Sequence, residues 1–89
     1  MKVITMKNKV LVELIVPDID KKYNLFLPAN KKIGTITSLI IKAINDTSGG
    51  NYELESTLCL YSRLSGTIYD TNLILRQTNI RNGTVLILM

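Results

Sequence analysis

The side chain with the greatest intrinsic reactivity is the single cysteine, Cys59. A cysteine becomes a nucleophile when a nearby cation stabilises its thiolate, and Arg63, on the same face if both residues lie in one strand, is the one candidate. The sequence contains no histidine, so neither a Ser-His-Asp nor a Cys-His arrangement can be built. A free cysteine in a strand is far more often a small buried hydrophobe. We therefore predict no catalytic residue and no enzymatic activity.

Cofactor and metal sites are also not indicated. Gly49-Gly50 and Gly66 do not fall in the spacing of a phosphate-binding glycine loop. Histidine, the commonest transition-metal ligand, is absent, and Glu53 and Glu55 lie in a polar stretch where solvation is expected. We predict neither a cofactor nor a bound metal.

Composition bounds the class of protein. A chain of 89 residues with 46% hydrophobic and 20% charged residues is typical of one globular domain. No apolar run approaches the roughly 18 residues that span a bilayer, and the start, MKVITMKNKV, lacks the apolar segment of a secretory leader. We expect a cytoplasmic protein without membrane insertion. The net charge of +4 comes from dispersed lysines and arginines without interleaved aromatics, so we predict no nucleic-acid partner.

The elements expected in the first half are two strands and a helix. Residues 10–16 alternate so that Val10, Val12, Leu14 and Val16 face inward, and residues 23–27 form the next strand, with Phe26 on its other face. Residues 31–45 then change to a helical period. Asn30 or Thr35 is the predicted N-cap, and Gly49-Gly50 the stop. The expected buried stripe consists of apolar residues at helical spacing: Ile33, Ile36, Leu39, Ile40, Ala43 and Ile44.

The pattern in the second half of the sequence predicts further strands. Residues 58–61 and 68–69 flank a turn at Gly66, residues 70–79 contain a helical turn, and Asn82-Gly83 turns the chain into a closing strand. This order predicts an α+β fold of the β-grasp type: a mixed sheet of four to five strands, the first and last parallel, with one main helix packed on one face. Residues 1–9 would be an N-terminal extension and residues 10–89 the domain.

The order of elements, the size and the closing segment resemble ubiquitin. More narrowly, LPANKKIGTITSLIIKAI at 27–44 and IYDTNLILRQTNIRNGTVLIL at 68–88 resemble the YukD/EsaB family, small bacterial ubiquitin-like proteins associated with type VII secretion systems. The resemblance is carried by the Leu-Pro-Ala entry to the helix and by the spacing from Leu73 through Ile80-x-Asn-Gly-x-x-Leu. It implies an accessory or regulator whose partners are membrane-embedded or cytoplasmic components of the secretion machine.

Covalent tags and sulfur carriers with this fold resemble one another in ending in Gly-Gly, because only residues without side chains pass the narrow channel of an activating enzyme. Here the sequence closes on Leu88-Met89, and Gly49-Gly50 is internal. We therefore expect a protein that is not conjugated. A sulfur carrier or protein modifier is the alternative.

A protein-binding surface is the remaining prediction. If Leu58, Leu60, Leu86 and Leu88 face the helix, their neighbours point away from it and form an apolar patch on the helix-free face. Four interpretations of this patch remain open: it binds a partner protein, it forms a homodimer, residues 1–9 cover it, or it has no role. The predicted interface consists of the outward-facing residues Phe26, Cys59, Tyr61, Arg63, Val85 and Ile87.

Overall fold

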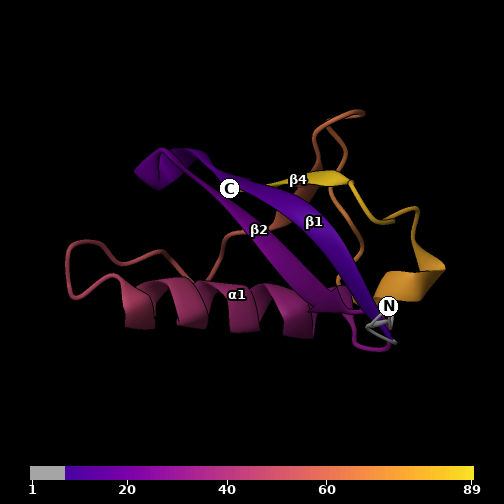
Figure 1. The fold of residues 1–89 in the computed structure, drawn as a ribbon, viewed down its shortest axis with the longest axis horizontal. Coiled ribbons are helices and arrows are strands. Elements are labelled where there is room, and N and C mark those ends of the chain that lie inside the picture. Colours follow the sequence, from indigo (N-terminus) through magenta and orange to yellow (C-terminus); the bar gives the residue numbers. More distant parts are fainter. Residues whose placement is uncertain (1–7) are drawn as a thin grey trace, which may run out of the picture.

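The computed structural model describes residues 8–89. It confirms the α+β β-grasp prediction (Figure 1). The first nine residues of the sequence, predicted as an extension, lie mostly outside the described residues, and the first strand begins at Lys9. The elements in chain order are β1 (Lys9–Val16), a 3-10 turn (Pro17–Ile19), β2 (Lys21–Pro28), α1 (Ile33–Thr47), β3 (Leu60–Ser62), a second 3-10 turn (Leu75–Gln77) and β4 (Val85–Leu88).

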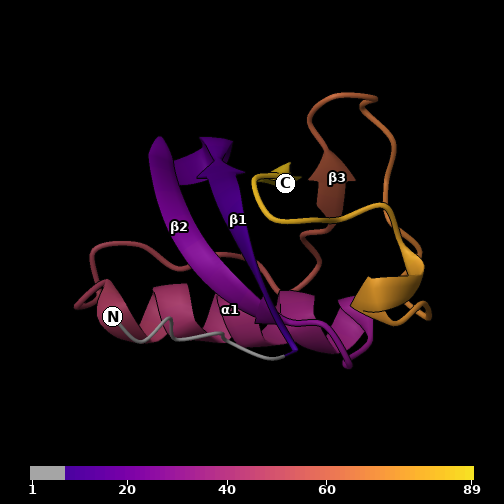
Figure 2. The same ribbon diagram turned by 45° about the vertical axis from the view of Figure 1, so that its right-hand side comes forward.

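The sheet has four strands in the order β2, β1, β4, β3 (Figure 2). β1 pairs with β2 antiparallel and with β4 parallel, and β3 pairs with β4 antiparallel. The predicted parallel pairing of the first and last strands is thus confirmed. Residues 68–69, predicted as a short strand, contribute only an isolated bridge between Tyr61 and Ile68.

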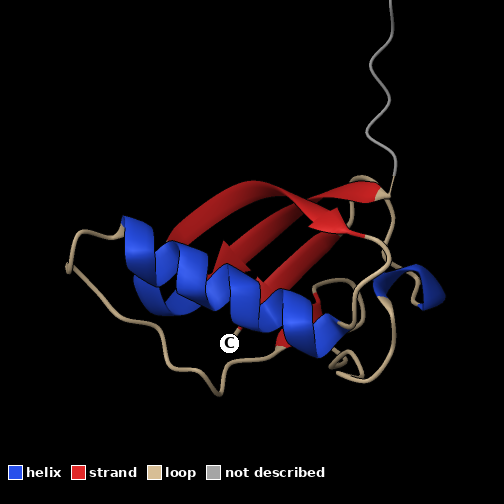
Figure 3. Cartoon of the chain, turned by 90° about the horizontal axis from the view of Figure 1, so that it is seen from below, coloured by secondary structure: helices blue, strands red, loops and turns tan. Residues whose placement is uncertain are grey.

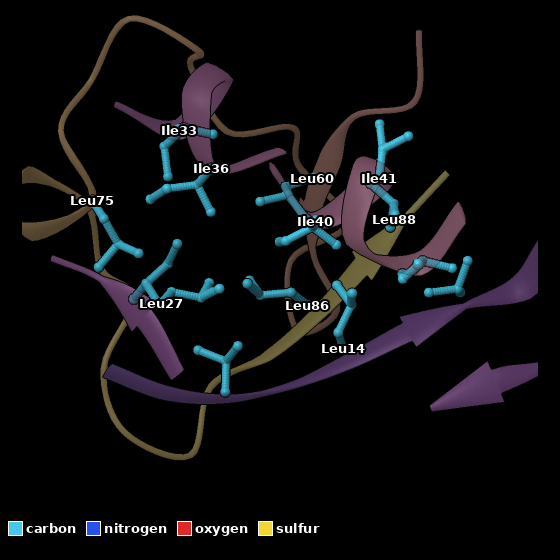
Figure 4. Close-up of a cluster of buried hydrophobic side chains, with 14 of the residues drawn as sticks. Leu14, Leu27, Ile33, Ile36, Ile40, Ile41, Leu60, Leu75, Leu86 and Leu88 are labelled. Carbon is cyan, nitrogen blue, oxygen red and sulfur yellow. The ribbon is translucent and has the colours of Figure 1, made fainter. Parts of the chain in front are cut away.

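The core lies between α1 and the sheet face that α1 covers (Figure 3). Alternation within each strand delivers one row of aliphatic side chains to this layer, as predicted for Leu86 and Leu88. Figure 4 shows side chains of the helix, such as Ile36 and Ile40, and of the strands, such as Leu86, gathered in this one cluster. Its members that are almost completely buried are Val12, Leu14, Val16, Ile33, Ile36, Leu60, Leu75, Ile80, Leu86 and Leu88.

The predicted buried stripe of α1 is wrong at one edge. Leu39 is 51% exposed, Ala43 one turn later is exposed as well, and Ile41, which was not assigned to the stripe, is 6% exposed. Leu39, Ile40 and Ile41 are consecutive and aliphatic, so helical spacing alone does not fix which edge is buried. The connection after the helix decides it: both amide atoms of Asn45 bond the backbone of Leu54, at 2.6 and 3.0 Å, which holds this connection against the Ile41 side.

The start of α1 also differs from the prediction. Lys32 is the N-cap and offers no side-chain cap, so neither Asn30 nor Thr35 serves. Instead the first amides of the helix, those of Ile33 and Gly34, donate to the carbonyls of Leu73 and Thr71 at 2.9 and 3.0 Å. A distant segment therefore supplies the cap, which satisfies donors that a helix N-terminus leaves free. At the other end, Gly49 and Gly50 have positive φ and end the helix as predicted.

Candidate functional site

The helix-free face of the sheet presents a row of apolar side chains at its centre. In the part of the chain that the structure describes, α1 covers only the opposite face (Figures 1 and 3). Ile87 of β4 lies directly opposite Tyr61 of β3 and beside Ile15 of β1. Neighbouring strands lie about 4.7 to 4.9 Å apart, so the three side chains form a continuous apolar strip across three strands.

Val85 and Cys59 extend this strip along the strands. Val85 pairs with Glu13, and Cys59 exchanges two backbone hydrogen bonds with Met89, at 2.9 and 3.0 Å. All of these apolar side chains are half-buried. We call this set the outer-face cluster, and it consists of Ile15, Cys59, Tyr61, Val85 and Ile87.

Arg63 lies at the margin of the outer-face cluster. Its backbone N–H donates to the carbonyl of Val85 at 3.2 Å, and its side chain is exposed. The Cys59 thiol donates to the carbonyl of Thr57 at 3.5 Å, and within residues 8–89 no hydrogen bond joins it to Arg63. The predicted interface residue Arg63 is therefore a polar neighbour of the strip, and the geometry offers no support for an activated cysteine.

Phe26 is not brought into the outer-face cluster. It pairs with Leu11 at the other end of β1, and the polar pair Asn24 and Glu13 lies between it and Ile15. Ile15, which the sequence prediction omitted, lies beside Ile87 at the β1 end of the strip. Its signal was present in the alternation of β1, because Ile15 shares the outward parity of Glu13. The predicted set took its residues from the second strand and the last two strands, and it included none from β1, although the parallel pairing of β1 with β4 was itself predicted.

Charged side chains surround the outer-face cluster. Glu13 lies beside Val85, Lys22 lies beside Ile15 on β2, and Arg63 follows Tyr61 along the chain. An apolar centre with a charged rim is the usual anatomy of a protein–protein interface. The arrangement can bind a surface of complementary shape.

No protein-family model matches the sequence, and no curated protein matches it. Solved structures do. The chain aligns over 91% of its length with 92% of the EccD5 ubiquitin-like domain from Mycobacterium xenopi, with a TM-score of 0.75 and 22% identity. The fold is ubiquitin-like. A second match, a solution structure of the N-terminal ubiquitin-like domain in the 4931431F19Rik protein, has a TM-score of 0.71 and 19% identity over 94% of this chain and 76% of that one.

A larger structure shares this ubiquitin-like fold in part of one chain. The alignment with a chain of the "MycP5-free ESX-5 inner membrane complex, State II" covers 92% of this chain, with a TM-score of 0.76 and 19% identity. It covers only 21% of that chain. This chain therefore spans about one fifth of the length of that one, and the likeness is one of fold.

Two further findings concern chemistry and membranes. Among residues 8–89, histidine, cysteine and acidic side chains form no group of three or more that could hold a metal ion. In the same residues no helix is long and apolar enough to cross a membrane.

A pair of tyrosines fastens the connection after α1 to the ubiquitin-like sheet. The hydroxyls of Tyr23 on β2 and Tyr52 lie 3.3 Å apart, and both side chains pack against the core on the helix side. This hydrogen bond, together with burial and repulsion from Tyr52, raises the pKa of Tyr23 from 10.0 to about 12. The neutral phenol is thus the form that the fold favours.

This shift predicts a loss of stability in alkali. Because the folded-state pKa lies above the unfolded value, the stabilisation from the tyrosine pair is complete below pH 10 and lost as the pH rises towards about 12. Absorbance titration of tyrosinate should show one late-ionising group, which Tyr23→Phe removes. Tyr52→Phe should bring the pKa of Tyr23 down towards 10. A late group that persists in Tyr23→Phe would contradict the assignment.

Proposed function

We propose that this chain is a non-conjugated ubiquitin-like module that binds another protein through its outer-face cluster and serves as an accessory or regulator of a type VII secretion system. It would resemble the YukD/EsaB proteins and work in the cytoplasm, without enzymatic activity, a cofactor or nucleic acid. The observation that carries the proposal is the strip formed by Ile15, Ile87 and Tyr61 across three neighbouring strands.

The strip supports binding because it is apolar although it lies on the solvent-facing side of the sheet. The open face of a sheet packed on one side is normally polar, with apolar residues reserved for the other face. Here apolar side chains alternate inward and outward through β4, where Val85 and Ile87 face out as Leu86 and Leu88 face in. A partner that covers Ile87 and Tyr61 gains their apolar area, and the aromatic ring with its hydroxyl is the kind of side chain that anchors interfaces.

The secretion assignment is supported from two directions. The segments at 27–44 and 68–88 resemble the YukD/EsaB family. Among the solved structures with this fold are EccD5, a type VII secretion component, and a chain of an ESX-5 inner membrane complex. The implied partners are therefore subunits of such a machine. The predicted interface residues Cys59, Tyr61, Arg63, Val85 and Ile87 keep this role in the proposal with Ile15 added, and Phe26 forms a separate pair with Leu11.

Affinity capture from native membranes and cytoplasm, followed by protein identification, tests the proposal. Secretion ATPase or membrane-channel subunits should be recovered with the native chain as bait. They should also be recovered with Leu64→Lys, a matched surface change at a side chain that is 99% exposed in the turn after β3. A thiocarboxylate or a covalent conjugate in the mass spectrum of the native protein would contradict the proposal, since it would identify a sulfur carrier or modifier. Recovery of this chain alone would replace the secretion partner with a homodimer.

A further inference from the structure

A second surface lies on the other side of the molecule, between β2 and α1. The structure contains a groove there of about 360 Å³, a volume within the range of roughly 300 to 1,000 Å³ that binding pockets span. The groove is predominantly apolar. Its aliphatic lining comes from the inward residues of β2 and from one side of the helix, and includes Leu25, Leu27, Ile36, Leu39, Ile40 and Ala43.

One wall of the groove is the free edge of the sheet. Within residues 8–89, β2 is an edge strand of eight residues, bonded on one side only, to β1. In an antiparallel pair, alternate residues direct their N–H and C=O groups to the partner and the others direct them away. The amide of Ala29 donates to the carbonyl of Asn8. By this alternation, the odd-numbered residues of β2 direct their N–H and C=O groups toward β1. The backbone groups of Lys22, Asn24 and Phe26 therefore point out along the groove.

An unpaired edge of this length next to an apolar groove is costly to leave exposed. Edge strands are usually blunted by charges, bulges or proline, because their free backbone groups template pairing with another chain. In β2, Lys21 and Lys22 lie at one end and Pro28 lies at the other. The stretch between them, from Tyr23 to Leu27, has no charged residue.

The charge of the groove selects its occupant. Lys9 and Lys31 line the end near Pro28, and none of the described residues that line the groove carries a carboxylate. At the opposite end, Asp18 and Asp20 in the turn before β2 offset Lys21 and Lys22. The uncompensated positive charge is therefore at the Pro28 end. A bound segment gains from acidic residues there, and from apolar residues at alternate positions that point into the groove.

We infer that the β2 edge and this groove form a second docking site, which takes an extended acidic-apolar peptide segment of a partner protein as an added strand. The added strand bonds the outward backbone groups of Lys22, Asn24 and Phe26. Its alternate side chains fill the space lined by Leu25, Leu27 and Leu39. Backbone pairing of this kind supplies affinity while the pockets for alternate side chains supply specificity. This site is separate from the outer-face cluster and does not depend on it.

The chain's own first residues are a poorer match in charge. The segment MKVITMK carries two lysines and no acidic residue, so it would add positive charge to an end that already holds Lys9 and Lys31. The acidic flank is thus the property that distinguishes a partner segment from this one.

The test uses the full chain and a peptide array. Each peptide has about eight residues, enough to cover the free edge. Its core has aliphatic residues at alternate positions, and the choice of these residues varies from peptide to peptide. The cores are flanked by aspartates in one set and by lysines in the other. Aspartate-flanked members should bind, more weakly at high salt, and lysine-flanked versions of the same cores should not.

Two variants locate the binding. Leu39→Glu places a carboxylate on the exposed helical wall of the groove and should weaken binding of the best peptide by at least about tenfold. Leu64→Glu, the same change at the fully exposed turn after β3, should leave binding unchanged. In the bound state, hydrogen exchange should slow at the amides of Lys22, Asn24 and Phe26.

Three results would overturn the inference. The first is an array in which no aspartate-flanked peptide binds. The second is binding that Leu39→Glu does not weaken, or that leaves the exchange of the three amides unchanged. The third is slow exchange of those amides in the chain without peptide, since the edge would then be occupied by the chain's own residues or by a second copy.

Discussion

Replacing Ile87 with lysine is expected to reduce partner binding by at least roughly 30-fold, which corresponds to about 2 kcal/mol, the threshold of an interface hot spot. Ile87 is the middle of the strip, with Tyr61 on one side and Ile15 on the other, so a cation there would be buried without a partner charge in any complex that covers the strip. Tyr61→Lys should act in the same way. The measurement is the yield of captured subunits or, once a subunit is purified, its dissociation constant.

The fold should survive this change. Ile87 is half-buried and points away from the core, and the strand preference of lysine differs from that of isoleucine by less than about 1 kcal/mol. A far-ultraviolet spectrum and a melting curve close to those of the native chain are the controls. Undiminished capture by a folded Ile87→Lys would show that the partner uses another surface.

Leu86→Ala, one residue earlier, is expected to reduce stability: it should lower the free energy of unfolding by about 3 to 5 kcal/mol. Leu86 is completely buried between Leu14 and Ser62, its partners on the neighbouring strands, and beneath the helix. Truncation leaves a cavity that rigid strands on both sides cannot close. For a domain whose total stability is typically about 5 to 15 kcal/mol, such a loss is a large fraction.

Urea unfolding followed by circular dichroism measures this loss, and Ile87→Ala is the matched control. That variant removes a side chain of the same size from the same strand but from the outer face, so its cost should stay near 1 kcal/mol. Equal losses in the two variants would contradict the assignment of inward and outward faces in β4.

The sequence predicted the architecture because each element carried its own local signal. Alternation fixed the faces of β1 and β4, and glycines with positive φ at 49, 50, 66 and 83 lie where turns or helix ends were predicted. The helix N-cap could not be predicted in the same way. The carbonyls of Thr71 and Leu73, which cap α1, come from a segment far along the chain, and no local preference reports such a contact.

The candidate site was predicted in part for the same reason. Tyr61 and Ile87 were placed on neighbouring strands, and the structure puts them directly opposite each other. Ile15 was missed and Phe26 was included, because their positions relative to β4 depend on the register of the parallel pair. One contact that accompanies this register comes from Asn82, whose side chain accepts from the amide of Leu11 at 2.8 Å. A side-chain contact of this kind has no periodic signature in the sequence.

This last hydrogen bond also bears on how the protein is made. It joins residues 71 positions apart, and β4 occupies the centre of the sheet next to β1. During translation, the β1–β2 hairpin therefore leaves the ribosome with its inner row uncovered and waits for β4 before the core can close. At about 5 to 20 residues per second the nascent hairpin waits on the order of seconds, a period in which a chaperone that shields aliphatic strands would raise the yield of folded protein.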